Sequence, residues 1–144
     1  MVALRVIAAA LLLGTVLGLP ARAEGDAVAG EKVFKKCMAC HKVGEAAKNS
    51  VGPVLNGVIG RPAGTAEGFS YSKLNSNCGA NGLVWTEQAI FDYLGDPTAF
   101  LKKFLTDAGK ADLITGATKM SLKLPAEADR LNVIAYLKKF SPAP

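Results

Sequence analysis

The chain is poor in several residue types that most often build functional sites. Its 144 residues include one histidine, one tryptophan, three cysteines and three methionines. With one histidine, the chain cannot supply two imidazole ligands to the same metal. Beyond Leu19 no apolar run approaches the roughly 20 residues of a membrane-spanning helix, so we expect no stable membrane insertion. No internal repeat or low-complexity segment occurs, and the length fits a single domain.

The charge balance is modest. Seventeen basic and 12 acidic side chains give a formal charge of +5. Aromatic residues do not interleave with the lysines in a stacking pattern, so we expect no nucleic-acid partner.

The N-terminus has the three parts of an export signal. Arg5 supplies the charged region, Val6 to Leu19 form the apolar region, and Ala21-Arg22-Ala23 is the cleavage site. The alternative is a retained N-terminal anchor. We predict a cleaved signal peptide at residues 1–23, a single domain at residues 24–144 and a periplasmic location. Loss of the two signal arginines lowers the formal charge from +5 to +3.

Helical patterns occupy both ends of the predicted domain. Asp26 can cap a first helix that runs to Cys37, and Thr86 can cap a second. Pro97 fits the first position of a third helix, and a last helix begins near Pro125. The segment 43–84 is punctuated by glycine and proline, which predicts loops and turns. The predicted class is all-α, with four to five helices and long loops. Such loops are unusual in a compact domain unless they wrap a cofactor.

The sequence Cys37-Met38-Ala39-Cys40-His41 carries the only histidine of the chain. Cys-x-x-Cys-His is the attachment motif of a c-type haem, with the cysteines bonded to the haem and the imidazole as iron ligand. With Cys78 the motif could form a Cys₃His zinc set, but His41 directly follows Cys40 and both would have to reach one metal. A thioredoxin-type pair would require a βαβ context, which is absent. We therefore expect one covalent haem c.

The second axial ligand follows by elimination. Met1 is lost with the signal peptide, and Met38 lies between the two attachment cysteines. Met120 remains, in a predicted loop before the last helix. Its alternative role is loop packing. If His41 and Met120 fill both axial positions, the site transfers electrons, whereas an open position would favour a haem enzyme or sensor of peroxidase-like type.

Two features remain open. Cys78 is left over after haem attachment, and it is either a buried inert thiol or a reactive group. Lysines flank the motif and recur in the C-terminal half, where they form either a docking face or an ordinary solvated surface. These lysines are Lys35, Lys36, Lys42, Lys102, Lys103, Lys119, Lys123, Lys138 and Lys139.

Several further motifs make the chain resemble class I c-type cytochromes, and closely the bacterial cytochrome c2 group. The resemblance covers about residues 25–140. Besides the haem motif it rests on Gly30 with Phe34, Gly52-Pro53, Gly60-Arg61, Gly68-Phe69-Ser70-Tyr71-Ser72, Trp85-Thr86, Tyr93-Leu94, Asp96-Pro97, Thr118-Lys119-Met120 and Ala135-Tyr136-Leu137-Lys138.

The resemblance implies roles for particular residues. The Pro53 carbonyl would accept a hydrogen bond from the His41 ring, and Tyr93 could donate one to the Met120 sulfur. Asn75 would also lie near the methionine side of the haem. The residues around the haem propionates would be Arg61, Tyr71, Ser72 and Trp85.

The implied function is that of a monomeric electron carrier in respiration or photosynthesis. It would take electrons from a membrane cytochrome bc complex and pass them to a reaction centre, an oxidase or another acceptor, docking on acidic surfaces. Two departures concern docking: the segment 102–117 is longer than in mitochondrial relatives, and Leu122 replaces an aromatic residue near the haem edge.

Overall fold

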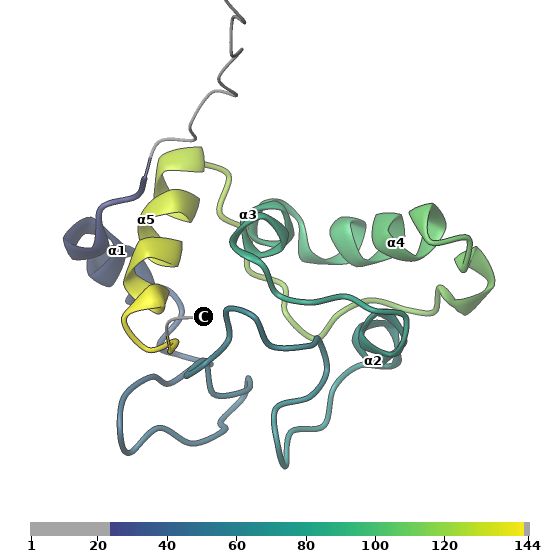
Figure 1. The fold of residues 1–144 in the computed structure, drawn as a ribbon, viewed down its shortest axis with the longest axis horizontal. Coiled ribbons are helices and arrows are strands. Elements are labelled where there is room, and N and C mark those ends of the chain that lie inside the picture. Colours follow the sequence, from purple (N-terminus) through teal and green to yellow (C-terminus); the bar gives the residue numbers. More distant parts are fainter. Residues whose placement is uncertain (1–23, 143–144) are drawn as a thin grey trace, which may run out of the picture.

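The computed structural model describes residues 24–142, so the predicted signal peptide lies outside the described residues. Five α-helices and one short 3-10 helix follow one another along the chain (Figure 1). They are α1 (Ala27–Phe34), α2 (Lys73–Ala80), α3 (Glu87–Gly95), α4 (Pro97–Asp107), η1 (Ala111–Leu113) and α5 (Glu127–Lys138). Across residues 24–142 the only β-type pairing is an isolated bridge between Pro62 and Val84. The predicted all-α class is therefore confirmed.

Side-chain caps begin three of the helices at the predicted residues. Oxygens of Asp26, Thr86 and Asp96 accept hydrogen bonds from backbone amides two or three residues further on, at 2.7, 3.1 and 3.0 Å. Pro97 is the first residue of α4, where its missing N–H costs no hydrogen bond. The last helix differs slightly from the prediction, because α5 begins at Glu127 and has no side-chain cap.

Helix α2 lies in the segment predicted to contain only loops and turns, so that prediction was wrong. Its sequence is rich in asparagine, serine and glycine, which have low helix propensity. Ser72 caps the helix by accepting from the Asn75 amide at 3.2 Å. Leu74 and Cys78 are fully buried. Tertiary packing therefore stabilises a helix that the local sequence disfavours.

The first and last helices pack together at one end of the molecule (Figure 1). Gly30 lies so close to the backbone carbonyl of Asn132 that a Cβ there would overlap it. The rings of Phe34 and Tyr136 pack beside this crossing in a tilted arrangement, with centroids 5.3 Å apart. The Asp26 amide donates to the Asn132 side chain at 2.8 Å. The crossing brings the residues that follow α1 against the core formed by α3 and α5.

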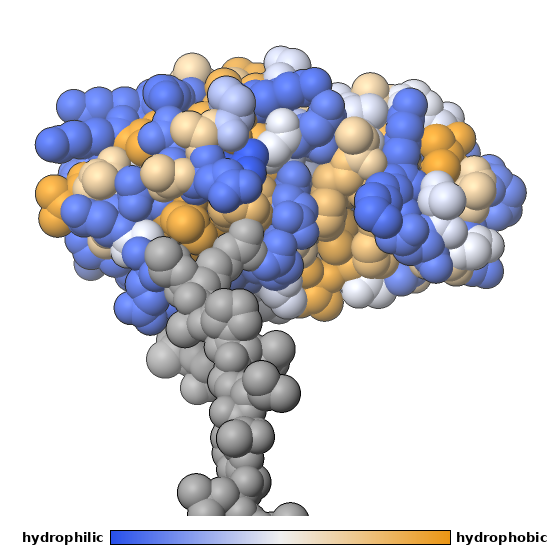
Figure 2. Space-filling model, turned by 90° about the horizontal axis from the view of Figure 1, so that it is seen from above, coloured by the Kyte–Doolittle hydropathy of each residue, from blue (hydrophilic) through white to orange (hydrophobic). Residues whose placement is uncertain are grey.

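Most of the chain between α1 and α2 forms long loops in the lower part of the view of Figure 1, and the connection from α4 to α5 runs back between the helices. Hydrophilic and hydrophobic residues are interspersed on the face seen in Figure 2. None of the helices within residues 24–142 has the length and apolarity needed to cross a membrane.

Candidate functional site

A cavity opens among the helices and loops, and every site residue expected from the sequence lines it. These residues are Cys37, Cys40, His41, Pro53, Arg61, Tyr71, Ser72, Asn75, Trp85, Tyr93 and Met120. They come from stretches that lie far apart in the sequence, from Cys37 to Met120. The cavity is therefore a product of the whole fold.

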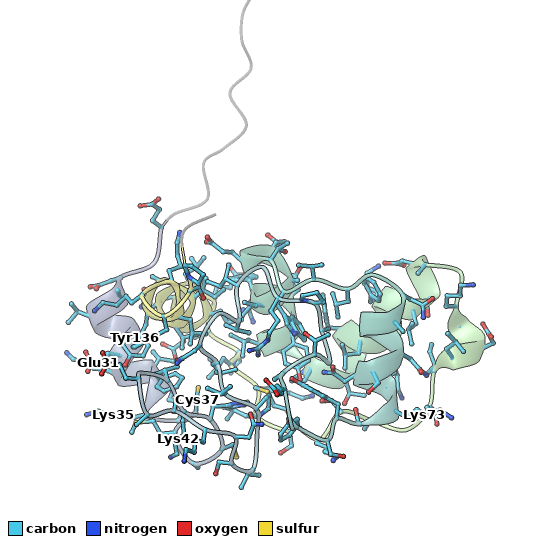
Figure 3. The ribbon with its side chains drawn as sticks, turned by 60° about the horizontal axis from the view of Figure 1, so that its bottom comes forward. Glu31, Lys35, Cys37, Lys42, Lys73 and Tyr136 are labelled. Atoms are coloured by element: carbon cyan, nitrogen blue, oxygen red, sulfur yellow. The ribbon has the colours of Figure 1, made fainter. Side chains whose placement is uncertain are left out.

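The two motif cysteines lie on the turns that follow α1. Backbone hydrogen bonds from Cys37 to Phe34 and from His41 to Cys37, at 2.7 and 2.8 Å, hold these turns. Cys37 is buried and Cys40 half-buried, and both thiols are free. Burial raises the pKa of Cys37 to about 11, although the charge of Lys36 acts in the opposite direction. Figure 3 shows Cys37 between α1 and the loops beneath it.

His41 is held in one orientation. Its Nδ1 lies 2.7 Å from the Pro53 carbonyl oxygen, which makes Nδ1 the protonated nitrogen and leaves Nε2 with a free lone pair. Gly52 allows this approach, because a Cβ there would come within 2.5 Å of the ring carbon Cε1. Burial lowers the imidazole pKa, and the charge of Arg61 lowers it further, against the opposing effect of the Pro53 hydrogen bond. The ring is therefore a neutral imidazole with a fixed direction.

Met120 lies in a loop between η1 and α5, residues 114–126, which we call the Met120 loop. It is half-buried and packs against the hydrophobic core. The Tyr93 hydroxyl lies 3.2 Å from Thr118 Oγ1, which also accepts from the Met120 amide at 3.3 Å. Sequence reasoning expected Tyr93 to donate to the Met120 sulfur, whereas the structure pairs it with Thr118. Burial raises the pKa of the Tyr93 phenol, so it stays protonated at neutral pH.

Arg61 places a partly satisfied charge in the cavity wall. Its Nη1 and Nη2 donate to the carbonyls of Asn56 and Val54, at 3.2 and 3.1 Å. Its Nε is buried and has no acceptor among the described residues, and the same holds for Asn75 Oδ1, which has no donor. Burial lowers the guanidinium pKa, but arginine remains charged in proteins. A buried unpaired donor beside a cavity indicates a bound acceptor such as a carboxylate.

The other expected polar residues have local partners. The Tyr71 hydroxyl accepts from the Ala66 amide at 3.2 Å, and Ser72 caps α2. Trp85 is buried against Tyr93, with ring centroids 4.8 Å apart in an edge-on arrangement. These contacts within the protein hold the cavity walls in place.

The chain is similar to proteins of known sequence and structure. No family model matches the chain. The chain is 61% identical over 118 residues to "Cytochrome c2 iso-1" of Rhodospirillum centenum, covering 82% of this chain and 98% of that protein. It is 62% identical over 112 residues to a "Cytochrome c2" of Rhodopseudomonas palustris, covering 78% and 96%.

Solved structures agree with these sequences. The structure of cytochrome c2 from Rhodospirillum centenum matches with a TM-score of 0.81 at 61% identity, covering 82% of this chain and all of that one. Ferricytochrome c2 from Rhodopseudomonas palustris matches with a TM-score of 0.77 at 59% identity, covering 81% and 99%. The chain belongs to the cytochrome c2 family. It is therefore an electron-transfer protein and not an enzyme.

The residues present fit the haem of a cytochrome c2. Two thiols and an oriented imidazole lie together on one short turn, and Met120 lines the same cavity. The walls between them are largely apolar, and Arg61 offers a buried donor for a carboxylate side group. The fit therefore rests on the chemistry of the donor set.

Cys78 lies apart from this set. It is a fully buried residue of α2, and its Sγ donates to the Leu101 carbonyl of α4 at 3.4 Å. It does not line the cavity, and within residues 24–142 no group of three or more His, Cys, Asp or Glu side chains could hold a metal ion. The zinc alternative has no support in the structure.

Sequence reasoning missed part of the cavity. Thr118 was recognised as part of a motif but not as the partner of Tyr93, although its place two residues before Met120 was a usable signal. The apolar wall residues carried no such signal, because a side chain that touches a cofactor looks the same in sequence as any core residue. These residues include Val51, Leu55, Val58, Ile90, Leu94, Val133 and Leu137.

Proposed function

We propose that the chain is a soluble, periplasmic one-electron carrier with one haem c bound through Cys37 and Cys40. His41 and Met120 would supply the two axial ligands. The observation that carries the proposal is the convergence of these side chains on one cavity, with the His41 ring fixed by the Pro53 carbonyl. The bound haem would supply a reversible one-electron couple.

The protein residues would set the properties of that couple. Hydrogen bonding to Pro53 fixes the tautomer and orientation of His41. A methionine ligand is a soft donor and raises the potential of haem iron. Arg61 would neutralise a haem carboxylate that burial would otherwise destabilise. With both axial positions filled, no substrate could reach the metal, which favours a carrier over a peroxidase-like protein or a sensor.

The partners would be membrane complexes with acidic docking surfaces. The donor would be a cytochrome bc complex, and the acceptor a photosynthetic reaction centre, an oxidase or another protein. Val51 lines the cavity and is 72% exposed, so it would give the docking face an apolar centre. Lys36 and Lys119 also line the cavity and are exposed. A small apolar centre with a basic rim suits weak, short-lived contacts by a monomer.

One preparation tests the cofactor and the processing together. The intact mass of the denatured protein should equal residues 24–144 plus one haem. A mass without haem would exclude covalent attachment, and a mass that includes residues 1–23 would exclude cleavage after Ala23.

The absorption spectrum of the ferric protein tests the ligands. We expect a low-spin spectrum with a far-red sulfur-to-iron charge-transfer band. The Met120→Ala variant should lose this band and have a lower reduction potential, because the soft donor is gone. An unchanged potential in this variant would exclude Met120 as ligand. A high-spin wild-type spectrum that shifts with cyanide would favour the open-site alternative.

A further inference from the structure

Helix α3 anchors the Met120 loop on both sides of Met120. Before Met120, the Tyr93 hydroxyl meets Thr118 Oγ1 at 3.2 Å. After it, the Leu124 amide donates to the Leu94 carbonyl at 2.8 Å. The two anchors fall on consecutive residues of one helix. The place of the Met120 side chain therefore depends on both, and we call the second the exit anchor.

Arg130 of α5 reinforces the exit anchor from the other side. Its Nη1 donates to the Leu124 carbonyl at 2.9 Å and to the Pro125 carbonyl at 3.4 Å. Its guanidinium carbon lies 4.3 Å from the centre of the Phe91 ring. Gly95 leaves room for the group, since a Cβ there would stand 3.0 Å from Nη1. One side chain thus joins the loop exit to α3 and α5.

The geometry is specific to arginine. A planar guanidinium can stack on a ring and direct several donors at once, whereas an ammonium acts as a point charge. The Arg130 side chain is only 12% exposed, and its Nε finds no acceptor among the described residues. A buried charge with an unsatisfied donor contributes little net stability, because desolvation opposes the gain from its contacts. The contacts made by Nη1 point to a positional role.

We propose that Arg130 is a positioning residue that holds the exit of the Met120 loop and so keeps Met120 in place as a ligand. The inference rests on the proposed role of Met120. Without the guanidinium, the Leu124 and Pro125 carbonyls lose a charged donor. The loop exit then loosens, and an external ligand can compete with Met120 for the iron more often.

The test compares Arg130→Leu with wild type as haem-loaded proteins. Cyanide binding to the ferric form should be about tenfold faster or more in Arg130→Leu, because loss of one charge-assisted hydrogen bond corresponds to at least that factor. In Arg130→Leu the far-red charge-transfer band should be weaker. On heating, this band should be lost at a lower temperature than the helical structure. Arg130→Lys should restore part of both properties.

Glu127→Gln is the matched control. Glu127 lies 3.6 Å from Arg130 Nη2 and is 78% exposed, so this variant breaks the outer ion pair and leaves the carbonyl contacts intact. Cyanide binding in this variant should match wild type. A rise as large as that of Arg130→Leu would overturn the proposal, because the outer pair would then be the source of the effect.

Other outcomes separate the two proposals. If Arg130→Leu has a lower denaturation midpoint but a wild-type band and cyanide rate, Arg130 is merely structural and the inference fails. If Arg130→Leu does not fold, a folded Arg130→Lys with the wild-type cyanide rate overturns it equally. If the wild type lacks the charge-transfer band, the proposed function fails as well. If Met120→Ala loses the charge-transfer band and Arg130→Leu keeps it, the inference about Arg130 is wrong and the proposed function stands.

Discussion

Pro53 shows how one residue can act through its backbone on a proposed metal ligand. Its carbonyl holds the His41 ring from one side while Gly52 gives the ring space. Either residue could be described from sequence as a turn former. Their combined effect is to choose which imidazole nitrogen is free. If His41 binds the iron as proposed, this turn is part of the metal site.

Cys78 gives a prediction at the same scale. The side chain is fully buried, and burial raises its pKa to about 11 from an ordinary value of 9.0. Because the thiolate is the reactive form, the thiolate fraction near pH 8 falls about a hundredfold. We expect no measurable reaction of the native haem protein with an aromatic disulfide reagent over an hour, and one rapidly reacting thiol after denaturation. Cys78→Ala provides the blank, and fast labelling of the native protein would contradict this inert role.

The predictability of single residues follows their chemistry. Met120, whose role as an iron ligand stays a prediction, could be proposed by elimination, because few side chains can bind iron and the chain offers few of them. Arg130 could not, because an arginine three residues after Glu127 reads as an exposed ion pair on a helix. Its contacts with Leu124 and Pro125 depend on how α5 meets α3. Positioning roles of this kind appear only with the tertiary structure.

At the scale of elements, two capping side chains and one proline predicted three helix starts, and composition failed for one helix. Asp26, Thr86 and Asp96 act within two or three residues of themselves, so local sequence contains the whole interaction. Helix α2 depends instead on burial of Leu74 and Cys78. Local sequence cannot report burial against distant residues.

The crossing of α1 and α5 gives a prediction at this scale. In Gly30→Ala the added Cβ would overlap the Asn132 carbonyl, a backbone group that cannot move without displacing α5. We expect a loss of at least about 2 kcal/mol in the free energy of unfolding, in the range of overpacked cores. Denaturant titration of the haem protein measures it.

Glu31→Ala is the neighbouring control for this crossing, since Glu31 is exposed on α1 and its loss should change stability by no more than about 0.5 kcal/mol. Equal effects of the two substitutions would mean that helix propensity matters more than the close approach of the helices.

At the scale of the whole molecule, the cavity and the core are one structure. Ile90, Leu94, Val133 and Leu137 belong to the hydrophobic core and also line the cavity. The long loops that looked improbable in the sequence pack around this shared interior. That they enclose a cofactor stays a prediction, and its physical reason is that a loop-rich domain needs apolar surface that its own chain does not supply.

Charge gives the last prediction, which concerns the docking face as a whole. Several lysines are already paired with carboxylates, such as Lys103 with Asp107 at 2.7 Å. Lys35 and Lys42 lie beside the haem motif, and Figure 3 shows both at the edge of the molecule near α1, with Lys73 at the opposite end of the view. Lys42 donates a hydrogen bond to the Met38 carbonyl, which is neutral and does not compensate the charge of the lysine. This edge should steer an acidic partner.

The rate of reduction by a purified cytochrome bc complex should therefore fall several-fold as ionic strength rises from about 10 to 200 mM, since the Debye length shrinks from about 30 to under 10 Å. Lys35→Gln should lower the rate at low salt and flatten this dependence. Lys103→Gln should do neither, because Lys103 lies on α4, apart from the haem motif and the cavity. A rate independent of salt, or equal effects of the two substitutions, would mean that the lysines form only a solvated surface and that apolar contact around Val51 governs docking.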